Sequence, residues 1–213
     1  MRLEIRAVPP FQKNGFVVWC EKSRDAVLID PGDEVEELVD IVEQNGLSVK
    51  YILLTHAHFD HISGVSRAKA KFGAPIYLHP GDRFFYENAV QQAALFGVQI
   101  EATPPVDQFY DGEGPLTFGD YEIRVHHTPG HCAGGVCLQA GPSGQAGKQL
   151  FVGDTLFAGS IGRTDLFGGD YDALIRSITT VLFAFGDDAD VYPGHGPKTT
   201  IGYERRTNPF VRQ

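Results

Sequence analysis

A seven-residue segment, Thr55 to His61, constrains this chain more than any other, because it places four side chains that can bind metal within six residues. The segment reads Thr-His-Ala-His-Phe-Asp-His and follows the apolar run Val49 to Leu54, which predicts a strand. Loops at strand ends have free backbone geometry, and imidazole and carboxylate groups are ligands for zinc, iron and manganese. The segment therefore predicts a metal site at the end of a strand.

The four side chains are expected to serve two different ions. His56 and His58 are two positions apart, so they point the same way in an extended loop. Asp60 and His61 follow where the chain bends towards a helix, and they are better placed for a second ion. Solvated histidines on a polar loop would explain each residue singly, but not all four together.

The composition is that of a globular chain, and we expect one domain over residues 1–213. Eighteen Lys and Arg against 27 Asp and Glu give a net charge of −9 without a basic stripe, so nucleic acid is not an expected partner. No segment resembles a signal peptide or approaches the roughly 20 apolar residues of a membrane span. Three cysteines without a framework spacing favour a reducing compartment, the cytoplasm.

Apolar periodicity predicts strands near both ends of the chain and helices between them. The predicted strands cover 3–8, 16–20, 26–29, 49–54, 75–78, 121–127, 135–140 and 149–152. The predicted helices cover a segment capped by Asp33 and stopped by Gly46, a segment from Val65 to Gly73, residues 82–96, and a long segment from Asp170 to Gly186. This order predicts a mixed α/β layered sandwich, with two sheets inside and helices outside.

Three later side chains, His131, Asp154 and His195, each follow an apolar run and stand beside a glycine. Glycine lets the backbone approach an ion closely or adopt positive φ. Each residue alone has an ordinary explanation as a turn cap or a solvated loop residue. Together with the segment from Thr55 to His61, they favour further metal ligands.

At these residues the chain resembles the metallo-β-lactamase superfamily, and within it the short, single-domain thioesterases similar to glyoxalase II (hydroxyacylglutathione hydrolase). The match rests on motifs in the family's order, Thr55-His-Ala-His-Phe-Asp-His61, Thr128-Pro-Gly-His-Cys-Ala-Gly134, Gly153-Asp-Thr-Leu-Phe157, Gly162-Arg-Thr-Asp165 and Tyr192-Pro-Gly-His-Gly196. The resemblance covers nearly the whole chain and implies the αββα four-layer sandwich, the metallo-β-lactamase fold.

The resemblance also implies a pair of divalent metal ions, with zinc expected and iron or manganese as alternatives. It implies that one metal is held by His56, His58 and His131, that the other is held by Asp60, His61 and His195, and that Asp154 bridges both. Two metals can share a hydroxide that is nucleophilic at neutral pH. Asp60 and Asp154 are then the catalytic carboxylates, as ligands of the metals that carry this hydroxide.

The implied reaction is thioester hydrolysis, with S-D-lactoylglutathione giving D-lactate and glutathione as the first expectation. A thiolate is a good leaving group, so little general acid assistance is needed. Long glyoxalase II enzymes look like this core plus a C-terminal helical domain that helps to bind glutathione, and only residues 196–213 follow the last ligand here. Arg163 is an expected substrate contact or an internal partner of Asp165, and Tyr192 is a second expected substrate contact.

Four alternative functions stay open from the sequence. Persulfide dioxygenases share the fold and the first motif, but are similar to a mononuclear iron site, whereas this chain keeps both ligand sets. Lactonases and other ester hydrolases of the superfamily use the same ligands, so the metals predict hydrolysis without selecting the ester. β-Lactamases match the chain less well at Asp154, and a non-catalytic metal-binding protein would need no complete ligand set.

Overall fold

The fold is described by a computed structural model for residues 1–110, 112 and 114–212. Its strands are β1 (Arg2–Arg6), β2 (Gly15–Trp19), β3 (Asp25–Ile29), β4 (Ser48–Leu53), β5 (Ile76–Leu78), β6 (Gln108–Phe109), β7 (Leu116–Phe118), β8 (Tyr121–His127), β9 (Val136–Pro142), β10 (Gln149–Gly153), β11 (Leu156–Phe157), β12 (Ser160–Ile161), β13 (Asp190–Pro193) and β14 (Thr199–Thr200). Its α-helices are α1 (Val35–Gln44), α2 (Phe59–Ile62), α3 (Val65–Phe72), α4 (Arg83–Glu87), α5 (Ala89–Leu95), α6 (Tyr171–Arg176) and α7 (Ile201–Thr207).

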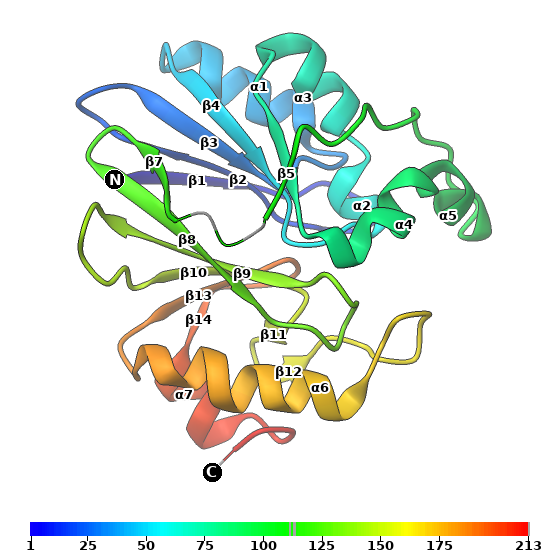
Figure 1. The fold of residues 1–213 in the computed structure, drawn as a ribbon, viewed down its shortest axis with the longest axis vertical. Helices are drawn as coiled ribbons and strands as arrows, with labels where there is room; N and C mark the ends of the chain where they lie inside the picture. Colours follow the sequence, from blue (N-terminus) through cyan, green and yellow to red (C-terminus); the bar gives the residue numbers. More distant parts are fainter. Residues whose placement is uncertain (111, 113, 213) are drawn as a thin grey trace.

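The strands form two six-stranded sheets and a small β11–β12 pair. The first sheet has the order β1-β2-β3-β4-β5-β6, antiparallel from β1 to β3 and parallel from β3 to β6. The second has the order β14-β13-β10-β9-β8-β7, in which only β10 and β13 are parallel. Figure 1 shows α1 and α3 over the outer face of the first sheet, and α6 and α7 over the outer face of the second. The predicted αββα four-layer sandwich is confirmed.

Three apolar layers hold these four layers together, and the alternation of side chains along each strand explains them. In β2, Val17 packs towards the helices of the first sheet, whereas Phe16 and Val18 pack between the sheets. In β10, Phe151 lies between the sheets and Leu150 packs under the helices of the second sheet. The central strands are therefore apolar on both faces, which explains why their sequences read as continuous apolar runs.

Three predicted helix details differ from the structure. Asp33 does not cap α1, because Glu34 occupies the cap position, without a side-chain cap bond, and Asp33 accepts a hydrogen bond from Ser63 instead. The segment predicted as one helix over 82–96 is a 3-10 turn, η1 (Pro80–Asp82), followed by α4 and α5 with a break at Asn88.

The long segment capped by Asp170 changes its winding within the predicted bounds. Asp170 accepts from the backbone N–H of Ala173 at 2.8 Å, as predicted. The segment is α-helical only in α6 and continues as a π-helix, η2 (Ser177–Val181), and a 3-10 helix, η3 (Leu182–Phe185).

Among the described residues, no helix is both long enough and apolar enough to cross a membrane.

Candidate metal centre

The seven predicted metal ligands lie at the ends of strands from both sheets. His56 and His58 follow β4, and Asp60 and His61 lie in α2, directly after them. The loop from β8 to β9 carries His131, Asp154 follows β10, and His195 follows β13. The sandwich therefore brings together side chains that are up to 139 positions apart in the chain (195 minus 56).

The structure gathers these side chains into two adjoining groups. In each group, the potential ligand atoms lie within 4.8 Å of one another, and the groups are His56, His58 and His131, and Asp60, His61 and His195. Asp154 lies between them, with Oδ1 3.4 Å from His61 Nε2 and Oδ2 3.7 Å from both His131 Nε2 and His195 Nε2. This arrangement suits a carboxylate that is shared by both groups.

A close approach of the backbone makes this packing possible. A Cβ atom at Gly194 would lie 2.2 Å from Asp154 Oδ1 and 2.6 Å from His61 Cε1. No side chain larger than hydrogen fits between the loop of His195 and these two ligands. The glycine beside the last ligand is thus required by the geometry of the centre.

The polar atoms at the centre provide a direct test of whether a cation fits. His56 Nε2, His61 Nε2 and Asp154 Oδ1 are buried, and none of them has a hydrogen-bond partner among the described residues. Buried polar atoms are normally paired, so atoms left free at one point indicate a ligand. Nδ1 of His58 and Nε2 of His131 also point at each other, 2.8 Å apart. A set of imidazole and carboxylate groups of this kind fits divalent metal ions.

The outer nitrogens of four of these imidazoles are fixed by the surrounding protein. Asp30 Oδ2 lies 2.9 Å from Nδ1 of His61, and Thr55 Oγ1 lies 3.1 Å from Nδ1 of His56. Two backbone carbonyls hold the others, that of Arg163 at His131 Nδ1 (2.8 Å) and that of Phe11 at His195 Nδ1 (3.1 Å). Such outer contacts fix the ring orientation and the tautomer of a metal ligand.

Asp30 is a residue of the site that the sequence did not identify. It is fully buried, accepts from the backbone N–H of Thr55 at 2.7 Å and from its hydroxyl at 2.5 Å, and contacts His61. Its position after an apolar run, before Pro31-Gly32, was interpreted only as the end of a strand. The same signal of a polar residue at a strand end, which identified Asp154, could have identified Asp30.

Burial and neighbouring charges prepare the side chains for metal binding. Burial, reinforced by the other imidazoles, holds the pKa of His56 well below its usual value and lowers the pKa of His58 to about 3, so both are neutral. The pKa of His61 is raised to about 10, because Asp154 and Asp60 outweigh the opposing effect of burial. In the protein alone, His61 therefore supplies the positive charge that balances these carboxylates, and a divalent cation supplies the same balance.

The two carboxylates stay ionised despite being enclosed. Burial alone would raise the pKa of Asp154 and of Asp60, but His61 outweighs it, and His131 and His195 add to the lowering for Asp154. His195 also donates towards Asp60 Oδ2 at 3.1 Å. The centre thus presents two ionised carboxylates and the neutral imidazoles of His56 and His58, and His61 must release its proton when a metal binds.

Asp82 is a second buried carboxylate that the sequence did not identify, and it joins two ligand loops. Its Oδ2 accepts from the backbone N–H of Ala57 at 2.9 Å, and its Oδ1 accepts from that of Gly134 at 2.6 Å. The thiol of Cys132 donates to Oδ2 at 3.2 Å. Ala57 lies between two ligands of the first group, and Gly134 follows the third, so Asp82 holds the two sides of this group together.

The thiol of Cys132 is fully buried, and burial together with Asp82 raises its pKa well above the usual value. It is also one of three cysteines, Cys20, Cys132 and Cys137, that are buried and free.

The N-terminal segment holds the loop of the last ligand. Lys13 and His195 form an isolated antiparallel bridge, and Asn14 donates its side-chain amide to the carbonyls of Pro193 (3.0 Å) and Gly196 (2.8 Å). Lys13 is itself buried and ion-paired at 2.6 Å with the buried Glu34. A lysine in a polar stretch gives no sequence signal of such burial.

The two predicted substrate contacts lie in different surroundings. The Arg163 guanidinium pairs with both carboxylate oxygens of Asp165, at 2.7 and 2.8 Å, which is the internal alternative expected from the sequence. Tyr192 lies in the core between the sheets, where its ring stacks on Phe151 at 5.2 Å and meets Phe16 at 6.4 Å. The structure therefore gives Tyr192 a packing role, and its predicted contact with substrate has no support from this position.

Comparisons with known proteins agree on one family. The model of the family described as the metallo-beta-lactamase superfamily matches residues 8–195. Hydroxyacylglutathione hydrolase GloC of Haemophilus influenzae is 40% identical over 99% of this chain and 98% of its own. Two solved structures are also similar, BLEG-1 B3 metallo-beta-lactamase (38% identity, TM-score 0.89, all of both chains) and TTHA1623 in a di-iron-bound form (42% identity, TM-score 0.85, 98% of this chain and 100% of the other).

Proposed function

The chain belongs to the metallo-beta-lactamase superfamily and is a metal-dependent hydrolase, and we propose that it cleaves a thioester, with S-D-lactoylglutathione giving D-lactate and glutathione. The similarity to hydroxyacylglutathione hydrolase over nearly the whole length of both chains supports this substrate. The single observation that carries the proposed chemistry is the pair of adjoining ligand groups with unpartnered buried atoms.

The residues of the two groups would hold two divalent ions, with Asp154 shared between them. Zinc is the proposed metal, and the di-iron form of a relative with 42% identity supports a pair of ions and keeps iron as an alternative. When bound, such ions lower the pKa of water towards neutrality and polarise a carbonyl oxygen.

The chain's own carboxylates have roles that follow from their positions. Asp154 is ionised and lies where both groups meet, and Asp60 is ionised within the second group, so both can accept hydrogen bonds from a water molecule and orient it. His195 is the most exposed of the seven side chains and lies next to both carboxylates, so substrate approaches from its side. Thioester cleavage suits this set because a thiolate leaves without a strong general acid, and no nucleophilic Ser or Cys is needed.

The proposed partner is a small-molecule thioester, and the proposed location is the cytoplasm. Three free, buried cysteines support a reducing compartment.

One experiment tests this proposal. Purified protein is assayed on lactoylglutathione as isolated, after chelation, and after return of zinc, iron or manganese, with metal counted per chain. We expect activity with two ions per chain, its loss on chelation and its recovery with metal. Asp154→Asn should bind fewer ions and lose nearly all turnover, whereas Asp188→Asn, at an exposed side chain that pairs with Lys148, should behave like the parent protein.

Two results would replace the thioester by another substrate. A relative described as a B3 metallo-beta-lactamase is 38% identical over all of both chains, so a β-lactam belongs in the assay beside an acyl-homoserine lactone. Faster turnover of either ring substrate would overturn the thioester proposal. One iron per chain with oxygen uptake on glutathione persulfide would indicate the dioxygenase alternative.

A further inference from the structure

Two exposed phenylalanine rings and a partly buried one form an aromatic platform at the surface, which we define as Phe84, Phe167 and Phe85. The ring centroids are 6.1 Å apart for Phe84 and Phe85, and 5.9 Å from Phe167 to each of the other two. Phe84 is 61% exposed and Phe167 is 76% exposed. Large apolar side chains that gather on a surface usually mark a place where another molecule binds.

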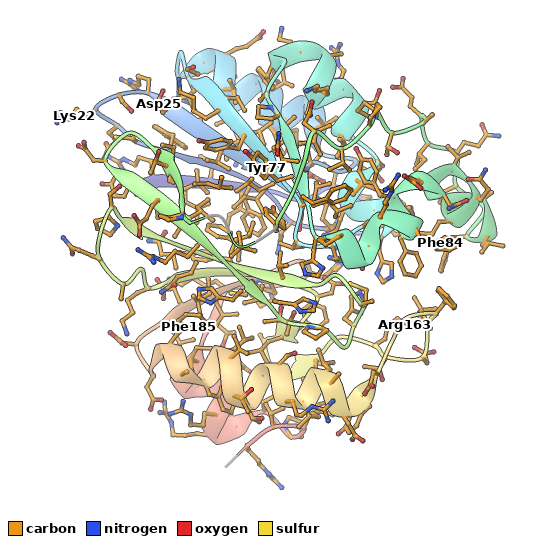
Figure 2. The ribbon with its side chains drawn as sticks, in the orientation of Figure 1. Lys22, Asp25, Tyr77, Phe84, Arg163 and Phe185 are labelled. Atoms are coloured by element: carbon orange, nitrogen blue, oxygen red, sulfur yellow. The ribbon has the colours of Figure 1, made fainter. Side chains whose placement is uncertain are left out.

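The aromatic platform is continuous with the metal centre. The ring of Phe85 meets that of the predicted ligand His58 edge to face, at 5.4 Å and 80°. Figure 2 shows Phe84 on α4 and Arg163, which begins the loop of Phe167, on the same edge of the molecule. A group bound on the platform would therefore lie beside the first ligand group.

The loop that carries Phe167 is fixed relative to the centre at both of its ends. At its start, the carbonyl of Arg163 contacts His131 Nδ1 at 2.8 Å. At its end, the backbone N–H of Asp170 donates to the carbonyl of Gly130 at 2.8 Å. Both anchors lie in the segment of the predicted ligand His131, so both ends of the loop are held beside the centre.

The charges beside the aromatic platform are paired with one another. Arg163 binds both oxygens of Asp165, and Arg83 pairs with Glu87 at 2.6 Å. Each guanidinium is already paired with a carboxylate of the protein. Neither is therefore free to bind the carboxylates of a glutathione moiety. The surface is thus apolar with balanced charges, and it complements an uncharged apolar group better than an anionic one.

We propose that the aromatic platform binds an apolar group of the thioester, so that the centre also accepts thioesters with an aromatic or bulky aliphatic substituent next to the scissile bond. This inference rests on the proposed thioester hydrolysis. It names the specificity of the same centre, with Phe84 and Phe167 as binding residues and Phe85 as the link to His58.

The test compares three thioesters. Lactoylglutathione carries no apolar group, phenylacetylglutathione carries one on the acyl side, and the lactoyl thioester of benzyl mercaptan carries one on the thiol side. The variant is Phe84→Ala/Phe167→Ala, and the control is Tyr203→Ala, which removes an exposed ring from α7. We expect kcat/KM of the double variant to fall on the order of tenfold for at least one apolar thioester, mainly through KM, because two aromatic contacts are lost. The fall for lactoylglutathione should be much smaller.

Metal content and native mass are measured for the same proteins. An equal loss on all three thioesters, or no loss on any, overturns the proposal. A lower native mass for the double variant with unchanged selectivity would assign the aromatic platform to an interface between copies of the chain, and would also overturn it.

Binding separates a failure of this inference from a failure of the proposed function. If the parent protein cleaves none of the thioesters, the proposed function fails, and calorimetry with the S-benzyl thioether of glutathione still tests the platform. Binding that Phe84→Ala/Phe167→Ala weakens and Tyr203→Ala leaves intact supports the aromatic platform. Equal binding by all three proteins overturns it.

Discussion

Replacing Asp82 by asparagine tests how the two sides of the first ligand group are held together. Asp82 is fully buried and accepts from Ala57 N–H (2.9 Å), Gly134 N–H (2.6 Å) and the Cys132 thiol (3.2 Å). All three partners are donors, so an asparagine oxygen can serve one side only, and its amide faces a donor on the other. A hydrogen bond to a charged group is worth about 1.5–3 kcal/mol, and an unpaired buried polar group costs about 1–3 kcal/mol.

We therefore expect Asp82→Asn to lower the free energy of unfolding by about 3 kcal/mol, or the melting temperature by roughly 10 °C in a protein of this size. Metal affinity of the first group should fall about tenfold, because the loops of His58 and His131 lose their common anchor. The measurements are denaturant unfolding of the metal-free protein and metal titration of the folded protein. The matched control is Asp33→Asn, at an exposed aspartate that accepts from Ser63 at 2.6 Å, with an expected change within about 0.5 kcal/mol. Equal stability of the two variants would refute the reasoning.

Three further predictions follow from the same contacts. Asp30→Asn should weaken metal binding by about 10- to 100-fold in a titration, because Asp30 orients His61, and unchanged affinity would remove that role. In metal-free protein, the pKa of His61 is raised to about 10, so its contribution to stability is complete below about pH 6.5 and is lost as the pH rises towards 10. The pKa of His58 is lowered to about 3, so stability falls as the pH drops below about 6.5. The free energy of unfolding, measured across pH, should therefore be greatest near pH 6.5, and a flat profile would contradict the charge balance. Tyr192→Phe should keep full turnover, whereas Tyr192→Ala should lower the free energy of unfolding by about 3–5 kcal/mol, because the ring packing is lost. Impaired turnover of Tyr192→Phe, without a loss of stability, would restore the tyrosine as a substrate contact.

The layers of the fold could be predicted from the sequence because each of them depends on local periodicity. The continuous apolar runs of β2 and β3 indicate strands buried on both faces, the helical spacing in α1 indicates one buried face, and the structure shows both. Gly73 ends α3 as predicted, in the left-handed conformation that glycine adopts readily. Clustering and positions after apolar runs indicated the candidate ligands, and the resemblance to the family implied their division between two ions. The structure brings the same side chains together where strand ends of both sheets meet.

The supports of the centre could not be predicted in the same way, because their partners are backbone groups far along the chain. Asp82 meets Ala57 and Gly134, and the amide of Asn14 meets carbonyls beside His195. Nothing in a local pattern distinguishes such an aspartate or asparagine from a turn residue. Asp33 illustrates the reverse error, since the pattern of a helix cap was present but Glu34 took the position.

The two ligand groups are completed at different points of synthesis, because His195, whose loop is held by Phe11 and Asn14, is the last of the predicted ligands to be made. His56, His58 and His131 have all been made before His195 exists, and β13, which carries His195 at its end, inserts between β10 and β14. The position of this last predicted ligand is fixed by Phe11 and Asn14, which precede all the other predicted ligands in the sequence. The second group is therefore completed by contacts between the earliest and the latest residues of the centre to be synthesised.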